Sequence, residues 1–203
     1  AMKRIAAVLA VLALVCCASA HTQAEDRETA TAVAVEAQSG NEFAVDLYGQ
    51  LAAEEGNIFF SPFSIRTALA MAYAGARGNT AKEMREVLVL KTPDERLHGV
   101  LAQLSAQMTT QPQDEHAFVL NVANSLWGQE GYPFKRPFLD LLKKHYGAGL
   151  QQVDFARATE EARQRINNWV EEETNDKIKD LLHKGDLTRM TVLVLTNAVY
   201  FKG

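Results

Sequence analysis

Cysteine is nearly absent from this sequence, and the little that is present lies at one end. Among the 203 residues only Cys16 and Cys17 carry a thiol. If the first 20 residues are removed, as we predict below, the remaining chain has no disulfide. Packing and hydrogen bonding must then supply its stability, which suits a fairly large domain better than a disulfide-stabilised mini-protein.

The sequence also lacks an excess of positive charge and a long apolar run. Its 21 Lys and Arg residues against 25 Asp and Glu residues give a net charge of -4. Nucleic acid is therefore not an expected partner, because nucleic-acid-binding surfaces need clustered Lys and Arg. The apolar run from Ile5 to Val15 is well short of the about 20 residues that cross a bilayer. No membrane span is predicted.

Motifs for metal binding and catalysis are missing as well. The five histidines show no metal-ligand spacing, so we expect no metal and no cofactor: His21, His98, His116, His145 and His183. The G-x-S-x-G string of nucleophilic hydrolases is absent, and no Lys-Ser or Lys-Thr follows Gly78 to make a phosphate loop. These absences argue against a self-contained enzyme.

The first twenty residues have the pattern of a secretory signal peptide. Lys3 and Arg4 form a basic start, an apolar run follows, and Ala18 to Ala20 supply small side chains for a signal peptidase. We predict a signal peptide over residues 1–20, cleavage between Ala20 and His21, and a secreted, extracellular product. Periplasmic location and a lipid anchor on Cys17 are lesser alternatives, because Cys16 stands where a lipobox needs a small residue.

Residues 21–38 read as a polar lead-in that can be mobile, and residues 39–203 as part of one α+β domain. Helical spacing, capping residues and glycine stops predict helices over 41–56, 62–73, 80–88, 92–108 and 137–146, with another from Thr159. Apolar or alternating runs predict strands over 57–60, 117–127, 150–155 and 191–201.

One polar residue interrupts the last of these strands. Residues 191–201 are so apolar that the strand must lie inside a sheet covered on both faces, yet Asn197 sits at its centre. A buried amide must find hydrogen-bond partners or destabilise the fold by a few kcal/mol. An outward-facing or backbone-satisfied amide is the alternative that the residues leave open.

Five strings occur in an order and spacing that resemble the serpin family. They are NIFFSPFSI, NSLW, FLDLLKKHYGAGLQQVDF, INNWVEEETNDKIKDLL and TNAVYFKG, and the resemblance extends from Gly40 to Gly203. It implies the serpin fold in part: helices A to F with strands 6B, 2A, 1A and 3A. It also implies that Ser61, Ser64 and Asn197 belong to the shutter, the group of residues beneath the opening sheet. The shutter histidine of the family lies on strand 5A, which this sequence does not contain.

The resemblance implies an inhibitor of an extracellular serine protease. In serpins a protease attacks an exposed bait loop, and the cut loop inserts into sheet A between strands 3A and 5A, distorting the protease. A non-inhibitory binding, carrier or chaperone protein is the alternative, and a cysteine protease is a further target class. Polyanion activation is not expected, because residues 93–108 offer only Arg96 and His98 as basic groups. A monomer is expected for the full-length parent.

The sequence departs from the family in one respect. It stops after the expected strand 3A and contains neither the hinge nor the bait loop, so we read it as a fragment or truncated gene model that is inactive by itself. Strand 3A is left with an open apolar edge, which favours aggregation. We therefore expect residues 21–203 to be poorly soluble in isolation, and a monodisperse, protease-resistant monomer would contradict this.

Overall fold

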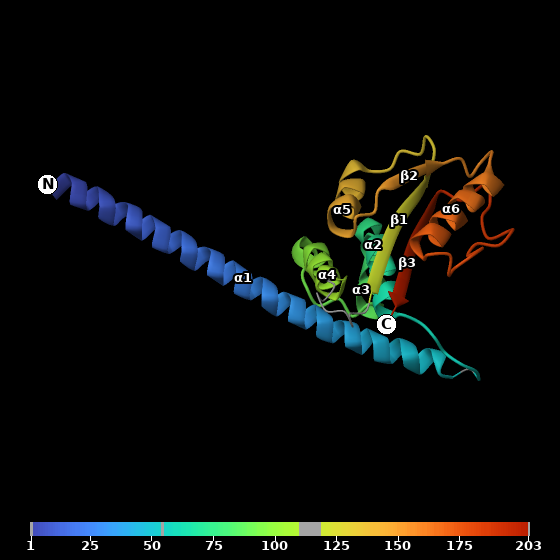
Figure 1. Cartoon of the computed structure of the whole chain (residues 1–203), viewed down its shortest axis with the longest axis horizontal. Helices are drawn as coiled ribbons and strands as arrows, with labels where there is room; N and C mark the ends of the chain where they lie inside the picture. Colours follow the sequence, from blue (N-terminus) through green and yellow to red (C-terminus); the bar gives the residue numbers. More distant parts are fainter. Residues whose placement is uncertain (1, 54, 110–118, 203) are drawn as a thin grey trace.

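The computed structural model describes residues 2–53, 55–109 and 119–202, with side chains described for 27–53, 55–109 and 122–200. Four helices come first, and strands then alternate with helices (Figure 1). In chain order the elements are α1 (Met2–Leu51), α2 (Pro62–Gly75), α3 (Gly78–Val87), α4 (Asp94–Thr109), β1 (Val119–Gln129), α5 (Arg136–Tyr146), β2 (Leu150–Val153), α6 (Thr159–Glu173) and β3 (Leu193–Lys202).

The three strands form one sheet in the order β2-β1-β3. β1 pairs parallel with β2 and antiparallel with β3 over most of its length. In this register Asn124 lies directly opposite Asn197, and Leu126 opposite Leu195. Residues opposite one another in an antiparallel pair share a face of the sheet, so the two asparagines point the same way.

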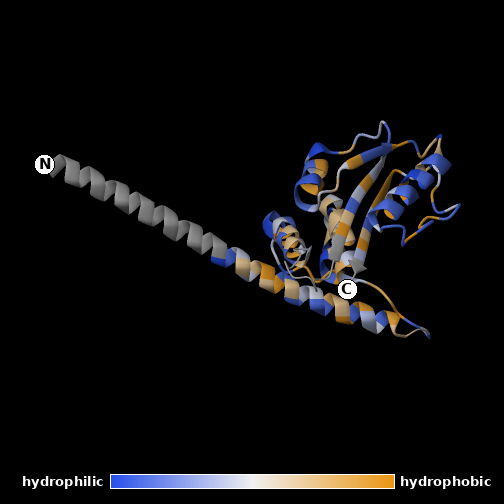
Figure 2. Ribbon diagram, in the orientation of Figure 1, coloured by the Kyte–Doolittle hydropathy of each residue, from blue (hydrophilic) through white to orange (hydrophobic). Residues whose placement is uncertain are grey.

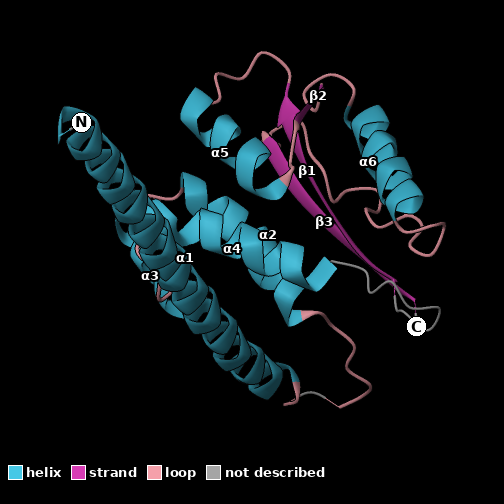
Figure 3. Cartoon of the chain, turned by 60° about the vertical axis from the view of Figure 1, so that its left-hand side comes forward, coloured by secondary structure: helices cyan, strands magenta, loops and turns pink. Residues whose placement is uncertain are grey.

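Helices cover both faces of the sheet (Figure 3). α2 and α5 lie against one face, where Leu126 packs with Met71 and Leu142, while α6 lies against the other, where Trp127 packs with Ile166. Neighbouring residues along a strand point to opposite faces, and both Leu126 and Trp127 are buried. The prediction of strands buried on two faces is confirmed for β1.

A second core lies between the helices away from the sheet. It joins α1, α2 and α4 through buried apolar side chains: Phe43, Ala70, Tyr73, Leu88, Leu90, Leu97 and Leu101. The orange stripes on these helices in Figure 2 mark the hydrophobic residues from which such packing is built. The first helix is therefore attached to the body of the fold by its apolar face.

Two glycines have a structural reason for being glycine. A Cβ at Gly128 would lie 2.6 Å from the Phe134 ring and 2.7 Å from Leu150, so a side chain there would disturb the junction of β1 and β2. Gly147, with φ 64°, adopts the left-handed conformation that ends α5.

A buried ion pair also attaches α1 to α2. Glu36 and Arg66 are 0% and 4% exposed, and Arg66 Nη2 lies 2.7 Å from Glu36 Oε2. The other Glu36 oxygen accepts hydrogen bonds from the backbone N–H groups of Lys91 and Thr92, at 2.8 and 2.6 Å. Arg66 also donates to the carbonyl oxygen of Leu88. This network sets the position of α2, which contains Ser64 and is capped by Ser61.

The structure differs from the sequence-based expectations within residues 21–60, where α1 ends at Leu51 and the sequence predicts a helix over 41–56. Residues 57–60, predicted as a strand, pair with no strand in the described part of the chain, and Phe59 is fully exposed. A strand is defined by backbone bonds to a neighbour, which this segment does not have here. Residues 21–38, read as a lead-in, lie within α1, and Val33, Glu36 and Ser39 are buried.

Three predicted caps are also displaced by a residue or more, and at α4, which begins at Asp94, Thr92 lies one residue before the cap position. Thr159, predicted as a cap, is the first residue of α6, and its hydroxyl donates to the Phe155 carbonyl oxygen at 2.6 Å. α3 starts at Gly78, before the predicted capping residue Thr80.

In the ranges that the structure covers, no helix combines the length and apolar character needed to cross a membrane.

Candidate functional site

The site begins at the N-terminus of α2, where the sequence favours a sharp helix start. Ser61 is the N-cap residue, and its hydroxyl accepts a hydrogen bond from the Ser64 backbone N–H at 3.3 Å. Pro62 occupies the first helical position, where a missing N–H group leaves no intrahelical bond unmade. The cap fixes the first turn and presents the Ser64 side chain to the sheet.

Ser64 and Asn197 join α2 to the sheet. The Ser64 hydroxyl donates a hydrogen bond to Asn197 Oδ1, and Asn197 Nδ2 donates to Asn124 Oδ1 at 2.8 Å. Both asparagines are half-buried in apolar strands. The amide of Asn197 thus has a partner on each side, one from α2 and one from β1.

Asn124 continues the network to α5. Its Nδ2 donates to the backbone carbonyl oxygen of Tyr146 at 3.3 Å. Tyr146 is the last residue of α5, and the last four carbonyl groups of a helix have no partner inside it. Asn124 therefore satisfies a helix end as well as its strand neighbour.

On the opposite face, a second polar contact ties the same two strands together. Trp127 Nε1 donates to Thr196 Oγ1 at 3.0 Å, and Thr196 Oγ1 donates to the Ser125 carbonyl oxygen at 3.4 Å. The Trp127 ring meets the Trp169 ring of α6 edge to face, with centroids 6.0 Å apart. Each face of the β1–β3 pair is thus linked to its covering helix.

The network itself carries no charge, and its titratable neighbours are kept neutral by burial. Burial raises the pKa of the Tyr146 hydroxyl well above its ordinary value. Burial, with a smaller effect from nearby His145, lowers the pKa of His98 to about 4 against the opposing effect of Asp94. Near neutral pH, His98 and Tyr146 therefore interact as uncharged groups.

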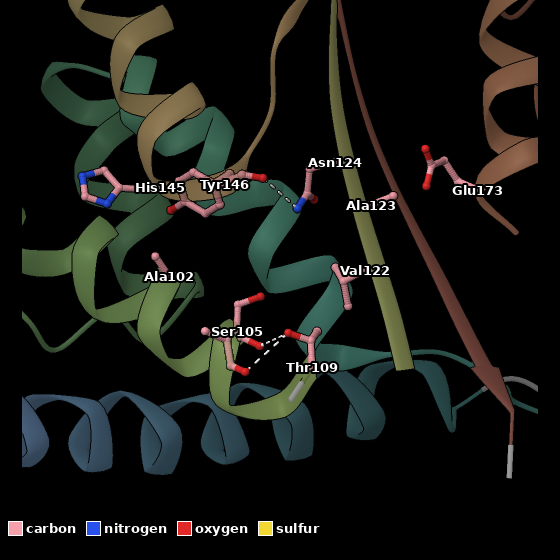
Figure 4. Close-up of a pocket in the computed structure, with 10 residues that line it drawn as sticks. Ala102, Ser105, Thr109, Val122, Ala123, Asn124, His145, Tyr146 and Glu173 are labelled. Carbon is pink, nitrogen blue, oxygen red and sulfur yellow. Dashed lines mark hydrogen bonds between the residues drawn. The ribbon is translucent and has the colours of Figure 1, made fainter. Parts of the chain in front are cut away.

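A cavity of about 490 Å³ opens beside the network (Figure 4). Asn124 and Val122 line it from β1, Ser105 and Thr109 from α4, and Tyr146 from α5. The close-up shows the Asn124 amide directed at the Tyr146 carbonyl oxygen on one side of this space. The strand and the two helices therefore do not pack solidly against one another here.

The structure brings together two of the three residues predicted to form the shutter. Ser64 and Asn197 are in contact, whereas Ser61 bonds the Ser64 backbone and has no hydrogen bond to Asn197 among the described contacts. The predicted cleavage site at Ala20 and His21 lies outside the residues whose side chains are described.

Sequence reasoning missed Asn124. Its signal is the same as that of Asn197, an amide inside an apolar strand, and only pairing of the two strands reveals that they meet.

Within the described ranges no three His, Cys, Asp or Glu side chains gather as metal ligands would.

Comparison with known proteins identifies the family of this chain. The model of the family Serpin (serine protease inhibitor) matches residues 38–203. An uncharacterised serpin-like protein of Thermococcus kodakarensis is 46% identical over 163 residues, which are 80% of this chain and 37% of that protein. The human leukocyte elastase inhibitor is 43% identical over 163 residues, which are 79% of this chain and 42% of that protein.

The fold agrees with these sequence matches. The solved structure of emu (Dromaius novaehollandiae) ovalbumin superposes with a TM-score of 0.75 at 31% identity, covering 83% of this chain and 46% of that one. This chain spans less than half the length of the relatives it matches.

Proposed function

This chain belongs to the serpin family, and from that premise we propose that the complete protein inhibits a serine-type endopeptidase by inserting its own cleaved reactive loop into the sheet. The name of one relative, leukocyte elastase inhibitor, supports a protease as the target. An inhibitor of this kind is a substrate that the protease cuts once, and is not itself an enzyme. The proposal concerns the whole protein, because this chain is the part that precedes the reactive loop in serpins.

One observation carries the proposal: the hydrogen-bonded chain from Ser64 through Asn197 to Asn124. It holds β3 and β1 against α2 with directional bonds instead of apolar contact alone. Such bonds keep a sheet closed until β3 moves, and they can then be exchanged for others at little net free energy. We assign to Ser64 and Asn197, with Ser61 capping the helix beneath them, the role of the serpin shutter.

The free edge of β3 supports the same proposal. β3 pairs with β1 on one side, and no strand pairs with its other edge in the described part of the chain. That edge presents unpaired backbone groups, which can accept an added strand. In serpins this edge borders the position that the cleaved loop enters. Residues 1–203 alone, which lack that loop, are not expected to inhibit.

The test uses the protein expressed from its complete coding sequence. We expect it to form an SDS-stable, near-equimolar complex with at least one protease from a panel of trypsin-, chymotrypsin- and elastase-type enzymes. Residues 1–203 expressed alone serve as the control and should give no complex. Cleavage without a complex would contradict inhibition and favour a binding, carrier or chaperone role. A complex with a papain-like cysteine protease alone would change the target class.

We also propose that the protein is secreted, because residues 1–20 combine a basic start, an apolar run and small residues at the end. Terminal sequencing of the exported protein should find His21 first. An intact N-terminus on protein retained inside the cell would contradict secretion.

Replacing Asn197 by alanine in the complete protein should weaken the closed sheet by about 1–3 kcal/mol, because Asn124 Oδ1 and the Ser64 hydroxyl each lose a partner. The measurement is the midpoint of thermal unfolding together with the temperature at which polymers first form. Asn168→Ala, at an exposed position on α6, is the matched control and should change neither. If the two variants behave alike, Asn197 does not hold the sheet closed.

A further inference from the structure

The hydrogen-bonded network does not end at Asn124. Tyr146 accepts the hydrogen bond from the side-chain amide of Asn124 at its backbone carbonyl oxygen. Its side chain extends to α4, where the hydroxyl lies 2.6 Å from His98 Nδ1. Tyr146 therefore connects the β1–β3 pair to a histidine on α4. Its backbone carbonyl group makes one contact and its hydroxyl group the other. The continuous path runs from Ser64 through Asn197, Asn124 and Tyr146 to His98.

His98 is enclosed at the end of this path. The residue is 7% exposed, and its ring packs against two tyrosines, Tyr146 from α5 with centroids 5.7 Å apart and Tyr73 from α2 at 6.3 Å. Moving this ring would therefore disturb the contact of α4 with both other helices.

The titratable groups near His98 come from α2, α3, α4 and α5. Asp94 lies one turn earlier on α4 and attracts a proton to the ring, but it already binds Arg85 of α3 and the hydroxyl of Tyr73. His145 of α5 opposes protonation of His98, and its own pKa is lowered by burial and by Lys144. Asp94 is thus already bound to other groups, and no hydrogen bond joins it to His98 among the described contacts.

We propose that Tyr146 and His98 are positioning residues of the shutter, which hold Asn124 in place only while the His98 ring is neutral and thereby make closure of the sheet sensitive to acid. This inference rests on the proposed role of Asn197 in keeping the sheet closed. In the protonated ring both nitrogens are donors, so the Tyr146 hydroxyl can only accept from Nδ1, and a charge is placed among buried rings. The Tyr146 side chain is then displaced, and with it the carbonyl oxygen that holds Asn124.

The direction of the pH effect follows from the two pKa values of His98. In the closed state its pKa is about 4, and a solvated ring has the ordinary value of 6.5. Between these values the open state binds more protons, so closure weakens as the pH falls from 6.5 towards 4. At pH 5 these values correspond to an increase of about 30-fold in the opening constant relative to pH 7.5.

The experiment is hydrogen exchange of the complete protein at pH 5.0 and 7.5, corrected for intrinsic exchange rates and followed in peptides covering 122–128 and 193–200. In the wild-type protein, the protection factors of these peptides should be about 30-fold lower at pH 5.0 than at pH 7.5. In His98→Gln, whose side chain can still bond the Tyr146 hydroxyl but does not titrate, protection should be equal at both pH values. Tyr146→Phe should be weakly protected at both.

Two controls separate a specific link from a general acid effect. His183→Gln removes an exposed histidine that lies away from the path and should keep the wild-type pH dependence. Tyr132→Phe removes the hydroxyl of a half-exposed tyrosine away from the path, and it should also behave as wild type. If His98→Gln retains the full pH dependence, or if both controls lose it, the proposal is wrong.

A further measurement uses only the wild-type protein and so does not require a variant to fold. If His98→Gln fails to fold, NMR titration of the wild-type His98 ring decides: a pKa near 4 supports the proposal, and a value of 6 or above overturns it. Because no protease is present in any arm, an absence of inhibition would refute the proposed function without deciding this inference. Conversely, a pH-independent sheet would refute the inference and leave inhibition standing.

Discussion

Replacing Glu36 by glutamine in the complete protein is expected to lower the unfolding free energy by about 3–5 kcal/mol. The substitution keeps the size of the side chain but leaves the guanidinium group of Arg66, which is 4% exposed, without its counter-charge. An uncompensated buried charge is among the most destabilising single changes in a protein. Urea unfolding at pH 7.5, followed by circular dichroism, measures the effect.

The structure gives the reason for so large an effect. Both Glu36 oxygens are used, one by Arg66 and one by the backbone N–H groups of Lys91 and Thr92. Glutamine has only one acceptor oxygen, so its amide nitrogen must face either the guanidinium group or the two N–H donors. The variant therefore loses hydrogen bonds in addition to the charge pair.

The pH dependence of the Glu36 effect provides an independent check. Burial by itself would raise the pKa of Glu36, but the hydrogen bonds from Thr92 and Arg66 outweigh it and hold the pKa below its ordinary value of 4.5. The stability that depends on the charge is therefore present above pH 4.5 and lost as the pH falls through the lower value in the folded state. The difference between wild type and Glu36→Gln should shrink in that acidic range.

A surface carboxylate on the same helix is the matched control. Glu42 lies 3.7 Å from Lys91 Nζ, and both side chains are about half exposed. Glu42→Gln should change the unfolding free energy by less than about 1 kcal/mol. Similar effects of the two substitutions would show that the buried pair does not hold α1 to α2.

Trp127→Ala is expected to destabilise the complete protein by about 3–5 kcal/mol, because it leaves a large cavity in the core between the sheet and α6. Trp127 is 2% exposed and packs with Phe155, Ile166 and Trp169. β1 is packed by helices on both faces and can move little, so the cavity stays largely open. The midpoint of urea unfolding by circular dichroism is the measurement, since the variant changes tryptophan fluorescence.

Trp127→Phe separates the ring packing from the hydrogen bond. Phenylalanine keeps an aromatic ring against Trp169 but cannot donate to Thr196 Oγ1. We expect a smaller loss, about 1–2 kcal/mol. If Trp127→Phe is as destabilising as Trp127→Ala, the hydrogen bond to β3, and not the packing of α6, determines stability at this position.

Local sequence patterns determined the element types over most of the described chain. The Ser61-Pro62 pair predicts where α2 starts, because an N-cap hydroxyl and a proline act within one turn of the helix. The apolar character of residues 191–201 predicts a strand covered on both faces, and the order of motifs identifies the family before any coordinates are considered. The need of Asn197 for partners also follows from its apolar neighbours alone.

Contacts between residues far apart in the chain could not be obtained in this way. Asn124 and Asn197 are 73 positions apart, and Glu36 and Arg66 are 30 apart, so no local period links them. Glu36 has the character of a solvated surface carboxylate in sequence, and it becomes a buried partner only once α1 packs on α2. Residues 57–60 have strand character but no described partner, because a strand needs a neighbour that local sequence cannot supply.

The sequence by itself therefore determined most of the segments that are helical or extended, the apolar character of their buried faces, and the family. Only the tertiary structure decided which polar groups meet in the interior: Ser64 with Asn197, Asn124 with Tyr146, and Tyr146 with His98. The physical reason is that backbone propensity and hydrophobic periodicity act over a few residues, whereas a buried hydrogen bond depends on the relative placement of whole elements, which is set by strand register and helix packing.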